Sequence, residues 1–530
     1  MNAGARTPMK APEHTETFVA SDLELKQLTN ADKTAGYRTV FKSSSMLGGS
    51  QGICYVLSVA RTKALAYLLG PSGIGLLSLY GSVAGSIGTL AGMGIGESSI
   101  REVAATMGKG NPRNIDITAK VVRRSCFLSG LLGLLICVLF GVPISKGVFG
   151  DSSHSVSVAL LGLTLFLGAM TSAEISLIQG TGQVSKLARL SIISSLAALA
   201  PVIFIYAWMG MDGIIPSLLL AAVLAYIPAR IASRGIADTK AKVSWLETFN
   251  KGRTLLSLGI AFMLTGLLWV GKDMLIRTSI TNSFGLDSTG MYQAAWAISG
   301  LFVNFVLRAM GMDFYPRLTA INHDAEAMRE AVCQQIEVGT LLALPGVIAT
   351  VGLSPLIIKL LYSSAFAPAS ILLTILACGV FFKVVSYPLN TIQLAKGDAK
   401  GFAVIGMVFG AFELGISLLL LSLMGLVGVA LAYPISTFLH VLGMLWVGKR
   451  MISFKPSRTV AIMFLVSILF IGASLLITFT LPVTPGLVLG FGITAASAVY
   501  CIKGLSSRLG EDHRLVRFAL KLPFGRWIFT

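Results

Sequence analysis

The stretch LLGPSGIGLLSLYGSVAG, residues 68–85, recurs 215 positions later as SFGLDSTGMYQAAWAISG, residues 283–300. The matched glycines are Gly70 with Gly285, Gly75 with Gly290, and Gly85 with Gly300. Self-similarity at a fixed spacing is the sequence signature of an internal repeat. This pair of stretches therefore predicts a chain made of two related halves.

Three shorter matches support the duplication. YRTV at Arg38 recurs as GRTL, and MGMDG (209–213) recurs as MGLVG (424–428), both at the same spacing of 215. A third pair, IQGTGQ from Ile178 and IQLAKGD from Ile392, is shifted by one position. Because glycine and leucine are abundant, one such pair means little, whereas four pairs in the same order indicate a repeat.

The composition is that of an integral membrane protein. Of the 530 residues, 54% are hydrophobic and only 12% are charged, with a mean hydropathy of +0.79, whereas soluble domains carry about 25% charged residues. Apolar runs near the roughly 20 residues that cross a bilayer recur along the chain. We predict an all-α integral membrane protein with about 14 transmembrane helices, since helices satisfy their own backbone hydrogen bonds. The predicted spans lie near residues 39–61, 74–95, 125–145, 156–178, 187–208, 213–229, 254–280, 290–312, 331–352, 366–388, 402–423, 425–446, 459–480 and 485–502.

Each copy of the repeat holds six predicted spans. An even number brings both copies into the membrane from the same side, so the two lobes form a parallel repeat, as in secondary transporters. Two such lobes enclose a central cleft that rocking opens to alternate sides, although a duplication can also serve a scaffold. The predicted parts are a flexible cytoplasmic tail (1–37), an N-terminal lobe (38–250), a C-terminal lobe (251–450), and a helical hairpin with a basic cytoplasmic tail (451–530).

The formal net charge of +18 follows the predicted topology. Lys and Arg fall mainly in the tails and in the loops on the side of the N-terminus, and the opposite loops carry little beyond Lys146 and Lys359. This positive-inside pattern puts both termini in the cytoplasm. The basic surplus then has lipid headgroups, not nucleic acid, as its partner. The six cysteines lie in or next to apolar stretches without ligand spacing, so we predict neither disulfides nor a metal site.

Charged residues inside the spans are the candidate site. Each costs about 3 kcal/mol or more in the membrane, so it normally faces a protein interior or a wet cavity. The candidates are the cations Arg61, Lys63, Lys272, Arg277, Arg308 and Lys383, and the acids Asp273, Glu174 and Glu413. Six cations against three acids make the predicted cavity net positive. Since arginine forks onto phosphate and lysine acts as a point charge, we predict an anionic phosphate or pyrophosphate ligand.

Helix geometry refines this set. Asp273 and Arg277 are four residues apart and can pair on one helix face, while Lys272 is displaced by about 100°. Subtracting 215 places Arg277 over position 62, between Arg61 and Lys63. These two point in nearly opposite directions, and we expect Arg61 to face the cleft. The alternative for a lysine or arginine near a helix end is to extend its charge to the headgroups.

The stretch ARTKALAYLLGPSGIGLLSLYGSVAGSIGTLAGMGIGESSIREVAA, residues 60–105, resembles the opening of bacterial oligosaccharide flippases, the O-antigen and exopolysaccharide translocases. Their superfamily also holds multidrug and toxin extruders and the peptidoglycan lipid flippase. The resemblance continues through MGIGES with Glu97, IQGTGQ and the region of Asp273, over roughly residues 36–450. It rests on glycine spacing and hydropathy rather than on an invariant signature.

The resemblance implies a flippase that moves a polyprenyl-diphosphate-linked oligosaccharide from the cytoplasmic to the outer leaflet of the bacterial inner membrane by alternating access. An arginine-rich cavity takes in the diphosphate and sugars, and Arg61 matches the position of a cavity arginine in the peptidoglycan flippase. The last two helices look like that relative's extra hairpin, which lines a lipid groove. The implied partners are the lipid-linked oligosaccharide, membrane lipids and polysaccharide assembly proteins.

Transport of such a cargo needs a source of energy. The sequence has no Walker A phosphate loop, so we expect neither ATP hydrolysis nor an enzymatic reaction, and no cofactor. Family members look ion-coupled, which makes Glu174, Asp273 and Glu413 candidates for binding H⁺ or Na⁺. The ordinary alternative for each is a salt bridge or a hydrogen bond between helices.

Three other functions stay open on the sequence alone. A multidrug extruder of the same fold predicts acids that dominate the cleft. A membrane polysaccharide polymerase or glycosyltransferase needs a sizeable outer loop or a carboxylate motif at the membrane face. A channel is the third alternative, against which the mixed charge of the cavity counts only modestly.

Overall fold

The computed structural model describes residues 22–108, 112–236 and 243–509, and all regular structure in these ranges is helical. The first lobe begins with one long, kinked helix and continues with shorter ones. Its elements are α1 (Asp22–Gly92), α2 (Ile95–Gly108), α3 (Pro112–Leu139), α4 (Gly141–Phe149), α5 (Ser155–Gly180), α6 (Val184–Met209), the short turn η1 (Gly210–Gly213) and α7 (Ile214–Ala232).

The second lobe repeats this plan and adds a hairpin. Its elements are α8 (Trp245–Ser299), α9 (Leu301–Ala320), α10 (Ala325–Gly352), α11 (Ser354–Leu361), the short turn η2 (Ser364–Phe366), α12 (Ala369–Ala395) and α13 (Ala399–Ile452). The hairpin consists of α14 (Arg458–Thr480) and α15 (Val483–Leu509). It packs against α10, where Arg508 donates to Glu337 over 2.6 Å.

Nine helical stretches among the described residues are long and apolar enough to cross a membrane. Three of them, Gly49–Gly92, Ser185–Ala232 and Lys400–Ile452, are 44, 48 and 53 residues long. Each has the length of two passes, since one pass takes about 20 residues. The kinked helix α8 and the following helix α9 lie outside this count, and with two further passes from them the all-α architecture agrees with the fourteen spans predicted from the sequence.

The duplication is visible in the backbone. Three pairs of glycines with positive φ are separated by 215 residues: Gly70 and Gly285 at 62° and 81°, Gly182 and Gly397 at 70° and 76°, and Gly210 and Gly425 at 57° and 63°. Only glycine adopts such angles without strain. The first pair bends α1 and α8, and the third pair separates the last two spans of each lobe. The two lobes therefore turn at equivalent positions.

One structural equivalence corrects the sequence alignment. The sequence matched Ile178 with Ile392, at a spacing one short of the others. The positive-φ glycines that follow α5 and α12, Gly182 and Gly397, restore the spacing of 215. The backbone conformation marks the equivalent positions better here than the side chains do, because only the turn needs glycine.

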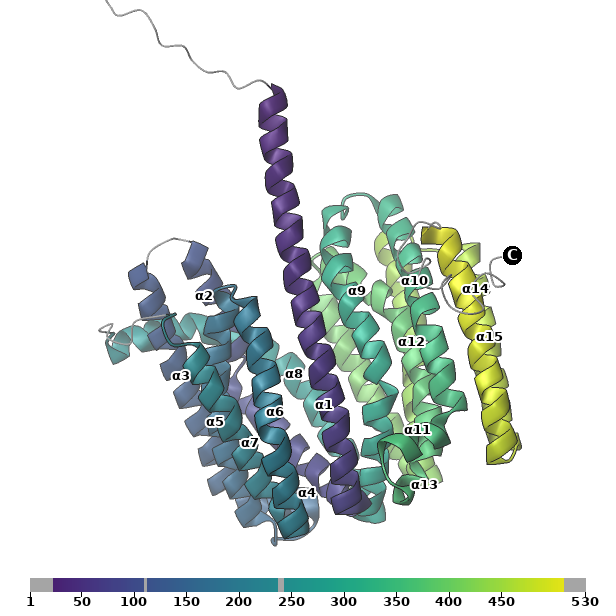
Figure 1. Ribbon diagram of the computed structural model, residues 1–530, viewed down its shortest axis with the longest axis horizontal. Coiled ribbons are helices and arrows are strands. Elements are labelled where there is room, and N and C mark those ends of the chain that lie inside the picture. Colours follow the sequence, from purple (N-terminus) through teal and green to yellow (C-terminus); the bar gives the residue numbers. More distant parts are fainter. Residues whose placement is uncertain (1–21, 109–111, 237–242, 510–530) are drawn as a thin grey trace, which may run out of the picture.

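Figure 1 shows the two lobes side by side, with α2–α7 on one side, α9–α15 on the other, and α1 between them. Helix α1 packs mainly against α8 and α6. The predicted flexible tail, residues 1–37, is helical from Asp22 onward and projects beyond the bundle (Figure 1). A stretch without proline or glycine before Gly36 offers nothing that would end the helix. Residues 1–21 and the basic tail 510–530 lie outside the described residues.

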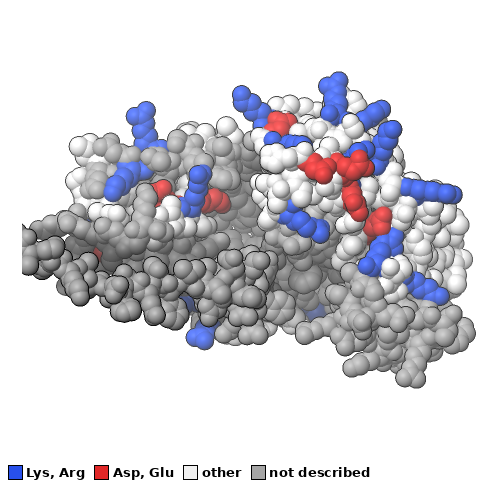
Figure 2. Space-filling model, turned by 90° about the horizontal axis from the view of Figure 1, so that it is seen from above, with Lys and Arg blue, Asp and Glu red and all other residues white. Residues whose placement is uncertain are grey.

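The face from which α1 projects also holds the end of α15 (Figure 1). Figure 2 shows this face from above, where Lys and Arg side chains project from both halves of the molecule. The two described chain ends therefore lie on one basic side of the bundle. This arrangement is the one that the positive-inside pattern predicts for a protein with both ends on the same side.

At the opposite end of the molecule the lobes touch through their backbones. A Cβ atom added to Gly290 would overlap the carbonyl oxygen of Pro71, and one added to Gly75 would overlap that of Leu286. Ser72 donates to Asp287 in the same place, and these two residues are also 215 apart. Equivalent segments of the two lobes thus close this end against each other.

We predict that Gly290→Ala opens this contact, because the new methyl group has no room against Pro71. In a variant that carries Ser72→Cys and Asp287→Cys, the yield of oxidative cross-linking should fall at least severalfold when Gly290→Ala is added. Gly271→Ala on the same helix, with nothing within 4 Å, is the matched control and should leave the yield unchanged. Equal cross-linking in the two variants would contradict the close contact.

Candidate functional site: a cavity between the lobes

A cavity of about 530 Å³ lies between α1 and α8. Its wall is mostly apolar, with a few polar groups, which is the usual character of a ligand pocket. The lining residues are Thr62, Leu65, Ile74, Leu77, Ser78, Gly81, Ser82, Leu218, Trp269, Val270, Asp273, Arg277, Gln293, Ala297 and Tyr362. Both lobes contribute, so a change in their relative position changes the cavity.

Arg277 is held in the cavity wall by groups from both lobes. Its Nε donates to Gln293 over 3.0 Å and its Nη1 to Ser82, on α1, over 3.1 Å. Nη1 also lies 3.9 Å from the carboxylate of Asp273, as the spacing of four residues predicted. Since a guanidinium has five N–H donors in a fixed fork, these bonds orient the group and leave donors for a ligand.

Lys272 is the centre of a buried charge network. It is 6% exposed, and its Nζ lies 2.8 Å from Glu413 on α13 and 3.7 Å from Asp273. The ring of Trp269 lies 4.9 Å from the same ammonium. Because an unpaired buried charge is expensive, this network ties α8 to α13. Lys272 and Arg277 share Asp273 and thus sit on either side of one carboxylate.

Lys383 adds a third cation near this network. It lies on α12, a largely buried helix, yet it is itself exposed, and it donates to Asn304 over 3.4 Å. Lys272, Glu413 and Asp273 are its charged neighbours. The exposed residue on this largely buried helix lies next to open space. Three cations and two acids therefore lie in one network, and of these Arg277 and Asp273 line the cavity.

Two predicted cations lie elsewhere. Thr62, and not Arg61 or Lys63, lines the cavity opposite Arg277. Arg61 turns to Tyr206 on α6, and Lys63 is exposed. This differs from our expectation for Arg61: with Thr62 facing the cavity, its neighbours on either side are each rotated away by about 100°. The side chain of Arg308, on α9, lies outside the described residues.

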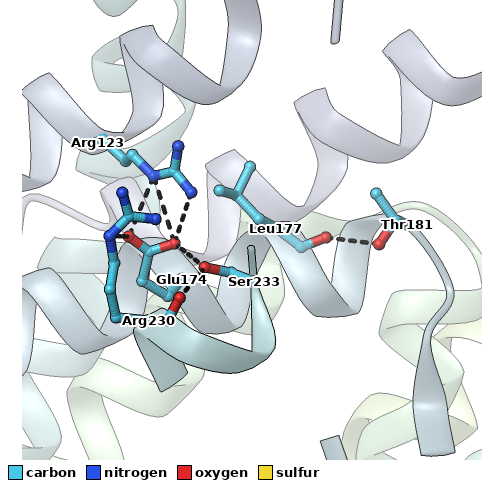
Figure 3. Close-up of polar contacts among 6 residues, drawn as sticks. All are labelled: Arg123, Glu174, Leu177, Thr181, Arg230 and Ser233. Atoms are coloured by element: carbon cyan, nitrogen blue, oxygen red, sulfur yellow. Dashed lines mark hydrogen bonds and ion pairs between the residues drawn. The ribbon is translucent and has the colours of Figure 1, made fainter. Parts of the chain in front are cut away.

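Glu174 forms a separate cluster in the first lobe, away from the cavity. Figure 3 shows Arg123 from α3 and Arg230 from α7 converging on this carboxylate, together with Ser233. Arg123 approaches to 2.9 Å and Arg230 to 3.6 Å, and Glu174 is 3% exposed. The cluster joins three helices, which is the structural alternative that the sequence left open for Glu174.

Sequence reasoning missed the neutral polar wall of the cavity. This wall includes Ser78, Ser82 and Gln293. None of them is charged, so the criterion of charged residues within the spans did not select them. Ser78 and Gln293 are 215 apart and both line the cavity, so the repeat spacing was the usable signal. Trp269 precedes Asp273 by four residues, which puts both on one helix face.

A duplicated, two-lobed helical bundle whose lobes meet around a charged cavity is the architecture of a secondary transporter. The family model described as polysaccharide biosynthesis protein matches residues 64–371, and the chain belongs to this family. Lipid III flippases of Escherichia coli (strain K12) and Shigella flexneri are each 25% identical over 273 residues, 51% of this chain. The match spans 65% of the length of these relatives.

Solved structures agree with the fold. The lipid II flippase MurJ in an inward closed conformation has a TM-score of 0.68 at 16% identity, covering 87% of this chain and 99% of that one. An inward-facing multidrug resistance MATE family transporter has a TM-score of 0.65 at 16% identity, covering 76% and 94%. The fold is thus shared by a lipid flippase and by multidrug transporters.

We predict that Glu174→Gln destabilises the first lobe by about 3 kcal/mol, because it leaves two arginines facing a neutral group. The apparent melting temperature of the purified, detergent-solubilised protein should fall clearly. Glu326→Gln removes a solvent-exposed carboxylate that pairs with Arg329, and such pairs contribute about 0.5 kcal/mol. If both variants had the melting temperature of the wild type, the cluster would not hold the three helices together.

Proposed function

We propose that this protein is a flippase that carries a polyprenyl-diphosphate-linked oligosaccharide from the cytoplasmic to the outer leaflet by alternating access. The observation that carries the proposal is Arg277 in the wall of the cavity between the lobes, with Lys272 and Lys383 in the charge network beside it. Family membership and the lipid III flippase relatives support the same cargo class.

The chemistry of the site supports an anionic headgroup. Arg277 is fixed by Ser82 and Gln293 and so is oriented before a ligand arrives. Hydrogen bonds from a guanidinium to phosphate are charge-assisted and about twice as strong as neutral ones. Lys383, beside the network of Lys272 and Asp273, supplies a second charge nearby. A diphosphate offers several oxygens to such a pair, and a cationic drug would be repelled.

The direction of transport follows from the proposed orientation, with both chain ends in the cytoplasm of a bacterial cell. In this orientation the closed contact of Gly75 with Gly290 lies at the outer face. Opening it requires α1 and α8 to separate, since each lobe contributes one glycine. Cargo then leaves toward the outer leaflet, while its polyprenyl chain stays among the lipids.

The proposal includes ion coupling through Asp273. All three acids are paired with cations, but the side chains of Glu174 and Glu413 are 4% and 11% exposed, whereas that of Asp273 is 32% exposed and lines the cavity. A proton or Na⁺ that reaches the cavity therefore meets Asp273 first. Because Asp273 lies between Lys272 and Arg277, its neutralisation increases the positive charge that faces the cargo.

We predict that Arg277→Gln lowers flipping of a fluorescent polyprenyl-diphosphate-linked oligosaccharide in proteoliposomes by about 10- to 100-fold, since charged hydrogen bonds contribute about 1.5–3 kcal/mol. Arg450→Gln, at the exposed end of α13, is the control and should flip at the wild-type rate. Undiminished flipping by Arg277→Gln would overturn the anion role. Export of a cationic dye in place of the lipid would identify a multidrug extruder.

We also predict that Asp273→Asn removes the stimulation of flipping by an imposed H⁺ or Na⁺ gradient. The rate without a gradient should persist, because the cations of the site remain. The measurement compares both gradients in the same proteoliposomes, with Asp398→Asn as a control for a carboxylate that caps α13. Full gradient stimulation of the Asp273→Asn variant would exclude Asp273 as the coupling group.

A further inference from the structure

The two walls of the cavity have diverged at equivalent positions. Both members of three pairs of residues that are 215 apart line it: Thr62 with Arg277, Ser78 with Gln293, and Ser82 with Ala297. The second lobe contributes a guanidinium and an amide, and the first lobe contributes three hydroxyl groups. One ligand that spans the cavity therefore meets different chemistry on its two sides.

The hydroxyl wall on α1 offers acceptors. The hydroxyl of Ser78 donates to the carbonyl of Gly75 over 2.8 Å, and that of Ser82 donates to the carbonyl of Ser78 over 2.9 Å. With its proton used in the helix, each oxygen can accept hydrogen bonds through two lone pairs, one of which Ser82 already uses for Arg277. Ionised phosphate has no proton to donate to them, whereas a sugar hydroxyl does. This wall therefore suits the carbohydrate part of the cargo better than the diphosphate.

Trp269 gives the cavity a flat apolar surface. It lines the cavity from α8 and is 54% exposed, although the neighbouring Lys272 is buried. An indole combines a large apolar face with one N–H donor. A pyranose ring has an apolar face of C–H groups and a rim of hydroxyls, so it can stack on the indole while its hydroxyls reach the serines of α1.

We propose that the cavity holds its cargo in one orientation, with the sugar nearest the diphosphate between Trp269 and the hydroxyls of Ser78 and Ser82, and the diphosphate at Arg277. This inference rests on the proposed function and assigns its carbohydrate subsite. Arg277 marks the boundary between the two parts, because it donates to Ser82 and faces the anion. Trp269 is thus the residue that recognises the sugar by stacking.

The test measures binding of two defined lipids to the full-length protein in detergent. One probe is undecaprenyl diphosphate, and the other is the same lipid with a single N-acetylhexosamine on the diphosphate. The variants are Trp269→Ala, Trp269→Phe and Arg277→Gln. Trp208→Ala, at a tryptophan that is 78% exposed on α6 and outside the cavity lining, is the control for loss of an exposed indole.

We expect Trp269→Ala to weaken binding of the glycosylated probe about tenfold, the size of a stacking contact. It should leave binding of undecaprenyl diphosphate unchanged, and Trp269→Phe should restore most of the loss. Arg277→Gln should weaken both probes equally. Trp208→Ala should bind both as the wild type does.

The possible failures are distinguishable. If Trp269→Ala weakened both probes equally, or neither, or if the wild type bound the glycosylated probe no better than the bare diphosphate, the carbohydrate subsite would be wrong while the anion site stood. If Arg277→Gln changed neither affinity, the proposed function itself would fail.

Discussion

Charges placed within a membrane need partners inside the protein, and this constraint organises both lobes. In the second lobe Lys272 lies between Glu413 and Asp273, so α8 cannot shift along α13 without leaving a buried ion unpaired. In the first lobe Glu174 joins α3, α5 and α7 in the same way. Each lobe is thereby held together by charge pairs that would be costly to separate.

Between the lobes the contacts are of another kind. The end of the bundle opposite the described chain ends is closed by backbone against backbone at Gly75 and Gly290, with Ser72 donating to Asp287, and across the cavity Arg277 donates to Ser82. Separating these groups exposes them to water in the cavity, where they find replacement hydrogen bonds. Relative motion of the two lobes therefore costs far less than deformation of either lobe, as the proposed alternating access requires.

The duplicated halves have kept their bends and changed their side chains. Positive-φ glycines persist at equivalent places because no other residue adopts those angles without strain, as at Gly70 and Gly285. The cavity positions carry no such backbone demand. Thr62 and Arg277 could therefore diverge within the same architecture, and a symmetric fold acquired two unlike walls.

The sequence by itself determined the helical class, the duplication and the pair of Asp273 with Arg277, because hydropathy, fixed spacing and the helix period are local properties of the chain. The tertiary structure alone decided which charges meet. Glu413 lies 140 positions after Asp273, yet it binds Lys272, and Arg61 turns to Tyr206 while Thr62 takes the cavity. The helix period fixes only the angles between the side chains of one helix. Which face of the helix lines the cavity depends on how the helices pack against one another.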